Sequence, residues 1–377
     1  VAGAEYKAAN FKRGLFGEHY RDTWATPVKV NFLDLNNFAG GLTPVKMGGG
    51  HQTISLQMKG KDGNTYQFRT IDKNPAALLP ESFLKTFAED LVQDQVSSAH
   101  PYGALIIPDM AKAIGIYHTD PRLVYMPYST ILGPYLQQIG GKLGIIEAKP
   151  DEDVSDFKSF GNAKNAVSTA KMYKEIREDN DNEVDQKMFL RARLFDLLIG
   201  DWDRHEDQWR WAEFKKPKGV LYRPIPRDRD QAFTKFDGII PSLISEILPD
   251  IQTFGMTIKD PAELSIAARN LDRNLLNKLS KADWQEVATD IQKDLTDEVI
   301  VKSVRKMPSE VYSKSGEELI EKLKSRRKQL ANVADTYYKI LAKEVTVAGS
   351  DKKEFFKVER NDKNSLLTIY KIDKNEQ

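Results

Sequence analysis

The alternation of apolar and polar positions predicts strands in the first part of the chain. Apolar residues alternate with polar ones over residues 54–58 and again over 66–68, and Asp62-Gly63 between them is typical of a hairpin turn. Short apolar runs over 123–126 and 143–147 predict two further strands. A shorter alternation at 28–32 predicts one more strand in an N-terminal extension, residues 1–35.

The later part of the chain has mainly helical spacing. Helices are expected over 81–98 and 102–114, over the strongly apolar 186–199, and over most of 240–343, with a strand at 220–225 and strand-like runs at 344–347 and 355–358. Residues 151–184 are polar and helix-prone, and Asp185 is expected to cap the helix that follows. Because strands and helices are largely segregated, the sequence predicts an α+β fold.

The length indicates more than one lobe. At 377 residues the chain exceeds what one hydrophobic core usually serves. The change from strands to helices places a β-rich small lobe at 36–150 and a helical large lobe at 151–343. Residues 344–377 are expected to form a β appendage or a linker to a following domain.

Charge and cysteine content exclude several functions. The net charge is +1, so composition favours neither nucleic acid nor an anionic membrane as partner. The chain has no cysteine, which excludes thiol catalysis and Cys-ligated zinc. It also lacks an apolar run long enough to cross a bilayer.

Two acidic segments carry the candidate chemistry, one over residues 200–209 and one over 226–233. Asp203 and, five positions later, Gln208 follow the apolar helix, whereas Asp228 and Asp230 follow the strand at 220–225. A base, a metal-binding amide and metal-binding carboxylates are the parts that phosphoryl transfer needs, because that reaction depends on positioning and on charge neutralisation by Mg²⁺ or Mn²⁺.

Candidate phosphate-binding groups lie upstream. The run Gly48-Gly49-Gly50 precedes the hairpin and leaves backbone N–H groups unshielded, with a flexible loop as its alternative reading. Arg69 and Lys73 end the second hairpin strand, and either could reach a phosphate or remain a solvated charge. Glu147 lies in the strand that closes the β-rich half and is included among the cofactor-binding candidates.

The segment Asp203-Arg204-His205-Glu206-Asp207-Gln208 resembles the D-R-H-x-x-N catalytic loop of atypical kinases, such as lipid kinases, HipA-like kinases, CotH spore-coat kinases and secretory-pathway casein kinases. The run over 228–233 resembles the D-x-D-x-x-F end of CotH-type chains. The resemblance implies a two-lobed protein-kinase-like fold and ATP as donor. It makes Asp203 the catalytic base, Gln208 and Asp228 metal ligands, and Asp230 a neighbour or substitute. Phe68-Arg69 matches the F-K of the nucleotide-binding strand. Arg69 therefore stands where these kinases have Lys, and Gln208 stands where they have Asn. His205 is a second catalytic candidate, with holding the loop as its alternative role.

A second resemblance covers almost the whole chain. The runs GLFGEHYRDTWATPV, VQDQVSSAHPYGAL and LIGDWDRHEDQWRW are similar to a largely uncharacterised domain of bacterial cell-envelope proteins. Members of that group often combine it with a calcineurin-like phosphoesterase domain and an outer-membrane β-barrel. This resemblance implies an extracytoplasmic location, in the periplasm or on the outer-membrane surface of a Gram-negative bacterium, and a possible link to a barrel domain.

Three functions therefore remain open. The first is a metal-dependent phosphotransferase with an unknown acceptor, and the second is an inactive pseudokinase-like binding or assembly module, which the two substitutions favour. The third is a metal-dependent phosphoester hydrolase that uses Asp201 and His205 together with the candidate carboxylates. A purely structural Arg–Asp network, formed by Arg204, Arg210, Arg227 and Arg229 with these carboxylates, is the main rival to any metal site.

Overall fold

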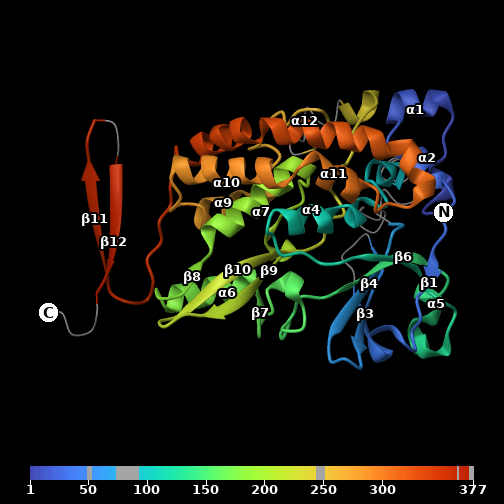
Figure 1. Cartoon of the computed structure of the whole chain (residues 1–377), viewed down its shortest axis with the longest axis horizontal. Coiled ribbons are helices and arrows are strands. Elements are labelled where there is room, and N and C mark those ends of the chain that lie inside the picture. The colour runs from blue at the N-terminus through green and yellow to red at the C-terminus, as the bar shows by residue number, and fades with distance from the viewer. Residues whose placement is uncertain (49–52, 74–92, 243–250, 363–364, 373–377) are drawn as a thin grey trace, which may run out of the picture.

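The computed structural model of the chain describes residues 1–48, 53–73, 93–242, 251–362 and 365–372. Its N-terminal part is built around a six-stranded sheet with the strand order β1-β5-β6-β4-β3-β2, seen at the lower right of Figure 1. The strands are β1 (Asn31–Phe32), β2 (Leu42–Gly48), β3 (Ser55–Gly60), β4 (Thr65–Thr70), β5 (Arg122–Tyr125) and β6 (Leu143–Ala148). Only the β1–β5 pair is parallel.

The two faces of this sheet differ because successive side chains of a strand point to opposite sides. One face carries Leu56, Met58, Phe68 and Ile146, which are buried in the core of the small lobe. The opposite face carries the polar partners of the same strands and looks toward the helical part of the chain. The predicted hairpin is therefore confirmed as β3–β4, and β2 is an additional strand that the alternation did not predict.

A second, four-stranded sheet connects the two halves. Its order is β7-β9-β10-β8, with β7 (Ala166–Ser168), β8 (Glu183–Val184), β9 (Trp209–Lys215) and β10 (Val220–Pro226). Trp209 and Trp211 of β9 are buried and contact the ring of Phe189, as expected for core residues. β9 was not predicted; its first residue, Trp209, is the last residue of the first acidic segment.

Most of the helices form the upper layer of the molecule in Figure 1, whereas α5 (Leu136–Ile139) and α6 (Thr169–Glu178) lie below, beside the two sheets. The others that the structure describes are α1 (Asn10–Phe16), α2 (Arg21–Ala25), α4 (Ile107–Ala113), α7 (Gln186–Ile199), α9 (Arg269–Leu275), α10 (Lys281–Asp294), α11 (Asp297–Val304) and α12 (Ser309–Leu341). The Asp185 side chain accepts a hydrogen bond from the Met188 amide at 3.1 Å, so the predicted cap of α7 is confirmed. A β-rich N-terminal part and a mainly helical C-terminal part confirm the predicted fold class.

The N-terminal residues are tied to both halves of the chain. Tyr6 donates a hydrogen bond to Asp72 at the end of β4, and Tyr20 donates to the carbonyl of Phe233 at 2.6 Å. The Arg21 guanidinium forms a buried two-pronged ion pair with Asp94. The N-terminal segment therefore contacts both the residues that follow β4 and the second acidic segment, and holds the two in place.

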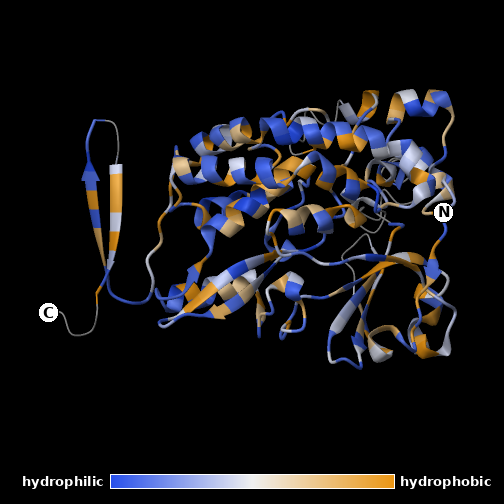
Figure 2. Cartoon of the chain, viewed as in Figure 1, coloured by the Kyte–Doolittle hydropathy of each residue, from blue (hydrophilic) through white to orange (hydrophobic). Residues whose placement is uncertain are grey.

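The chain ends in a hairpin of β11 (Glu354–Arg360) and β12 (Ser365–Lys371), which stands apart from the rest of the molecule in Figure 1. Figure 2 shows hydrophobic positions along it, and Phe355, Val358 and Leu366 are exposed. The expected strand at 355–358 is confirmed as part of β11, whereas the one expected at 344–347 is wrong, because those residues pair with no strand.

The other sequence-based expectations have mixed outcomes. The helix expected over 102–114 is shorter, since α4 begins at Ile107 after a turn. Most of the helix expected over 81–98 lies outside the described residues. Among the helices that the structure describes, none combines the length and apolar character needed to cross a bilayer. The lobe boundaries at 35/36, 150/151 and 343/344 remain predictions.

Candidate active site

The predicted site residues meet in one cleft between the polar face of the six-stranded sheet and the two acidic segments. This central cleft has a volume of about 560 Å³. Nine of the predicted residues line it: Gly48, Arg69, Lys73, Glu147, Asp203, His205, Gln208, Asp228 and Asp230. Gly49 and Gly50 lie outside the described residues.

The fold brings the two acidic segments together through β9 and β10. Trp209 at the start of β9 pairs with Pro226 at the end of β10, and the Arg227 amide donates to the Gln208 carbonyl at 2.9 Å. The segments therefore leave the sheet side by side. α7 ends at Gly200 in the left-handed conformation (φ 70°), which glycine adopts without steric cost, and this turns the chain toward the cleft.

Arg326 of α12 fixes the end of α7. Its guanidinium is buried and donates to the carbonyls of Leu197 and Leu198 at 2.7 Å each, and to that of Thr257 at 2.9 Å. The last carbonyls of a helix lack a full set of partners within the helix, and here the Leu197 carbonyl also accepts from the Gly200 amide at 3.3 Å. The loop that carries Asp203 thus starts from a fixed point.

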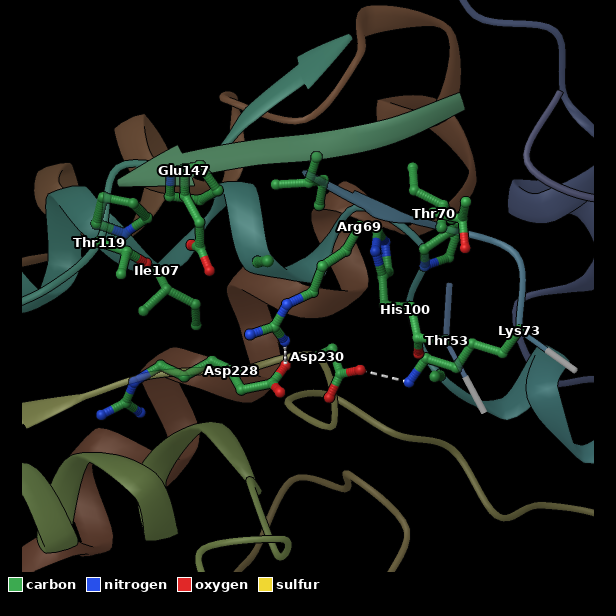
Figure 3. Close-up of a pocket in the computed structure, with 18 of the residues that line it drawn as sticks. Thr53, Arg69, Thr70, Lys73, His100, Ile107, Thr119, Glu147, Asp228 and Asp230 are labelled. Carbon is green, nitrogen blue, oxygen red and sulfur yellow. Dashed lines mark hydrogen bonds and ion pairs between the residues drawn. The ribbon is translucent and has the colours of Figure 1, made fainter. Parts of the chain in front are cut away.

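Two ion pairs cross the cleft from strand β4 to the second acidic segment (Figure 3). Arg69 pairs with Asp228, and the Lys73 ammonium lies 2.5 Å from a carboxylate oxygen of Asp230. Burial by itself would raise the pKa of Asp228, but the charges of Arg69 and Lys73 hold it below its ordinary value, so this carboxyl is ionised at neutral pH. Asp228 has a φ of 52°, a conformation that Asp tolerates better than most residues and that is common at functional sites.

Asp203 and His205 lie on the first acidic segment. Their side chains are 33% and 45% exposed, and His205 Nε2 is 3.8 Å from an Asp203 oxygen. Burial raises the pKa of Asp203 above its ordinary value, which makes the carboxylate a stronger base. His205 Nδ1 accepts from the Asp207 amide at 3.3 Å, so His205 does hold the loop, as its alternative role required.

Oxygen ligands for a divalent cation are present at the cleft floor. Gln208 is mostly buried and lines the same cleft as Asp228 and Asp230. Within the described parts of the chain, no group of three His, Asp or Glu residues could hold a metal by itself. Mg²⁺ is commonly bound by one or two carboxylates together with substrate phosphates, and this set of carboxylate and amide oxygens fits that mode.

Glu147 reaches the cleft from β6 and lies beside Arg69 (Figure 3). Burial raises its pKa, and the charge of Arg69 partly opposes that shift. The kinase resemblance also implies an acidic helix residue as partner of Arg69, and Glu89, Asp90 and Asp94 of the helix expected over 81–98 are the candidates. Asp94 is instead paired with Arg21 and Lys12, and the other two lie outside the described residues.

An Arg–Asp network exists, but it is centred on Asp196, which the sequence reasoning did not single out. This buried residue of α7 accepts from Arg193 at 2.7 Å and from Arg204 at 3.3 Å, and Arg229 lies 2.5 Å from its other oxygen. Arg204 and Arg229 come from the two acidic segments, so one carboxylate ties both to α7. The network therefore positions the cleft residues and leaves Asp203, Asp228 and Asp230 outside it.

Asp201 belongs to this network and not to the cleft. It is 1% exposed, and one of its oxygens lies 3.6 Å from Arg204. Neither of its carboxylate oxygens has a hydrogen-bond donor within the described chain, and burial raises its pKa to about 7. Its inclusion among the hydrolase ligands is therefore wrong, because it does not line the central cleft.

Several cleft residues were not predicted, among them Lys46, Gln57, Gln67, Lys149 and Arg227. Lys149 bonds to Asp151 and Gln57, whereas Arg227 has no carboxylate partner in the described chain, and its Nε is buried without an acceptor. Burial, with the nearby Arg210 and Arg69 charges, lowers the pKa of Arg227 to about 10. The polar positions of β3 and β4 were the signal that could have found the two glutamines.

The fold and the site together define a two-lobed α+β protein with a charged cleft between its lobes.

No family model matches the sequence, and no curated protein matches it. Twelve chains of solved structures are similar, and two of these structures are described here. One is the Helicobacter pylori proinflammatory kinase CtkA, with 14% identity over 77% of this chain and 95% of that chain and a TM-score of 0.37. The other is the HipA–HipB–operator DNA complex of Shewanella oneidensis MR-1, with 13% identity over 81% and 76% and a TM-score of 0.36. At these TM-scores neither likeness carries an argument about this chain.

Proposed function

We propose that this chain is a metal-dependent phosphotransferase with a kinase-like arrangement of its site. The observation that carries the proposal is the convergence of Arg69, Asp203, Gln208 and Asp228 on one cleft. They come from a strand and two loops that are far apart in the sequence, and each has the type of side chain that one step of phosphoryl transfer needs.

Each residue has a defined task. Asp203 accepts the proton of the acceptor hydroxyl, for which its raised pKa is suited. Asp228 and Gln208 would hold Mg²⁺ or Mn²⁺, with Asp230 beside them, and the bound ion would neutralise phosphate oxygens. Arg69 and Lys73 are within reach of the same carboxylates and bind the phosphates of the donor.

The expected donor is a phosphoanhydride, and ATP is the one that the sequence resemblance implies. A location in the envelope of a Gram-negative bacterium also stays part of the proposal, and the acceptor is left open. The second candidate is a binding module without turnover, and the Arg69–Asp228 pair favours it, because a guanidinium already neutralises the metal-binding carboxylate.

Calorimetric titration tests the proposal. Wild type and the variants Asp228→Ala and Asp207→Ala are titrated with Mg²⁺–ATP and with Mg²⁺–tripolyphosphate, and each ligand is repeated without metal. We expect binding by at least one ligand that needs the metal and is lost in Asp228→Ala. Asp207→Ala should bind like wild type, because Asp207 is exposed beside the cleft and does not line it.

Absence of heat with both ligands, or equal binding by Asp228→Ala, would refute the metal-dependent site. Where binding is found, transfer of labelled phosphate to the protein or to hydroxyl-bearing acceptors separates the phosphotransferase from the inactive module. Asp203→Asn should keep binding and lose transfer, since it retains the shape of the side chain and removes the base.

A further inference from the structure

Four charged residues meet at the end of the central cleft where the chain leaves β6. Lys149 and Arg210 both pair with Asp151, at 2.5 Å and 2.6 Å, and the charge of Asp151 also acts on Arg227. We call Lys149, Asp151, Arg210 and Arg227 the Asp151 cluster. Three positive charges and one negative charge give this cluster an excess of two positive charges.

Arg227 is the member of the cluster whose charge has no partner. It is half-buried and lines the cleft, none of the described carboxylates forms an ion pair with it, and its Nε is buried without an acceptor. Its guanidinium donates one long hydrogen bond, to the Asp207 carbonyl at 3.4 Å. Burial and the Arg210 and Arg69 charges lower the pKa of Arg227 to about 10. A desolvated cation in this state is unfavourable, and an anion bound beside it would remove that cost.

The Asp151 cluster lies at the opposite end of strand β4 from the ion pair of Lys73 with Asp230. The Lys149 amide donates to the Thr65 carbonyl at the start of β4, whereas Lys73 follows the end of the strand. A strand of this length spans about 17 Å. The cluster is therefore a separate place for an anionic group in the same cleft.

We propose that the Asp151 cluster is a second anion-binding site of the cleft, in which Arg227 binds a phosphate group of a substrate other than the phosphoryl group that is transferred. This inference rests on the proposed phosphotransferase function and narrows its substrates. A guanidinium presents planar pairs of N–H donors that match two oxygens of a phosphate. Two sources supply such a group: the donor, with a phosphate farther along its chain, and an acceptor that is already phosphorylated.

The first measurement needs no metal. Inorganic phosphate is titrated calorimetrically, without divalent cations, into wild type, Arg227→Gln, Arg227→Lys and, as a matched control, Arg360→Gln on the exposed hairpin. We expect wild type to bind phosphate and Arg227→Gln to lose about ten-fold in affinity, because hydrogen bonds to charged groups are the stronger class. Arg227→Lys keeps the charge and should lose less, and Arg360→Gln should match wild type.

Thermal unfolding separates a binding role of Arg227 from a structural one. Removal of a half-buried guanidinium without a charge partner should leave Tm unchanged or raise it, so a lower Tm of Arg227→Gln would mark the residue as structural and overturn the inference. Phosphate should raise the Tm of wild type more than that of Arg227→Gln, because a ligand of the folded state stabilises that state. Absence of phosphate binding by wild type, or equal binding by Arg227→Gln, would also overturn the inference.

A second titration identifies the source of the phosphate. Inorganic phosphate is titrated again with Mg²⁺–ATP or Mg²⁺–tripolyphosphate present, using the ligand whose binding Asp228→Ala abolishes. Displacement of phosphate from Arg227 assigns the site to the donor, and simultaneous binding assigns it to the acceptor. Asp228→Ala itself should keep the metal-free binding of phosphate. The two proposals therefore fail separately: phosphate binding that depends on Arg227, without any metal-dependent ligand, keeps the anion-binding site and refutes the phosphotransferase, and the reverse result refutes the anion-binding site alone.

Discussion

Arg326 provides a sensitive test of how the loop of Asp203 is held. This arginine is buried on α12, and its donors satisfy the carbonyls of Leu197, Leu198 and Thr257. Its carbon atom Cζ lies 4.6 Å from the ring centre of Phe254. Replacing it with Met keeps most of the apolar volume and removes every donor, so the variant isolates the hydrogen bonds.

The expected loss of stability follows from these contacts. A buried carbonyl left without a donor costs about 1–3 kcal/mol; Leu198 loses its donor and Leu197 keeps only the Gly200 amide at 3.3 Å, so the two together amount to about 3 kcal/mol. The guanidinium has its own burial cost, which lowers the pKa of Arg326 to about 9, and its removal offsets part of the loss. We therefore expect a net destabilisation of about 2 kcal/mol. With an unfolding entropy of about 2 cal/mol/K per residue, this lowers Tm by about 2–3 °C.

The assay is thermal unfolding by calorimetry, combined with hydrogen–deuterium exchange. Arg326→Met should lower Tm and speed exchange at residues 199–205, because the end of α7 is released. Lys328→Met, on an exposed position of the same helix, is the control and should leave both unchanged. If Arg326→Met unfolds at the wild-type temperature and its exchange at 199–205 is unaltered, the reasoning about the helix end is wrong.

Two further predictions concern Asp201 and the C-terminal hairpin. Burial raises the pKa of Asp201 to about 7, above its unfolded value, so the stability that its protonated form contributes is complete below pH 4 and is lost as the pH rises through 7. The Tm of Asp201→Asn minus that of wild type should therefore increase as the pH rises from 5.5 to 8. A difference that stays constant over this range would contradict the prediction. Removal of residues 350–377 should change Tm by less than about 2 °C, because the hairpin touches the body mainly through exposed ion pairs such as Lys371–Asp181 at 3.1 Å. A larger loss of Tm would show that the hairpin is part of the core.

The sequence predicted which elements carry the site residues, and in which order, better than it predicted the tertiary contacts of those residues. Hydrophobic spacing identified α7 and the β3–β4 hairpin, and residues that follow such elements were expected to meet. Strand alternation also explains why Arg69 faces the cleft while Phe68 faces the core. Local patterns are strong enough for this, because each depends only on neighbours along the chain.

The partners of these residues were not predictable in the same way. Asp196 lies in the middle of an apolar helix, and nothing near it in the sequence shows that Arg204 and Arg229 converge on it. The pairing of Arg69 with Asp228 joins residues from opposite sides of the cleft, and such contacts are set by tertiary packing. The strand β9 was missed for the same reason, since its pairing with β10 defines it more than its composition does.

The position of the Arg–Asp network bears directly on function. If Arg204 and Arg229 neutralised the cleft carboxylates, the acidic segments would need no ligand. A structural Arg–Asp network without chemistry would then explain them. Their guanidiniums instead turn to Asp196, on the side of the loops away from the cleft. Among the described residues, Asp203 has His205 as its ion-pair neighbour, and Asp228 and Asp230 are matched by Arg69 and Lys73 from the opposite lobe. Charges that are paired across an open cleft can exchange their partners for a phosphate and a cation. Charges buried in a core cannot do so. The cleft is therefore where a reaction is expected.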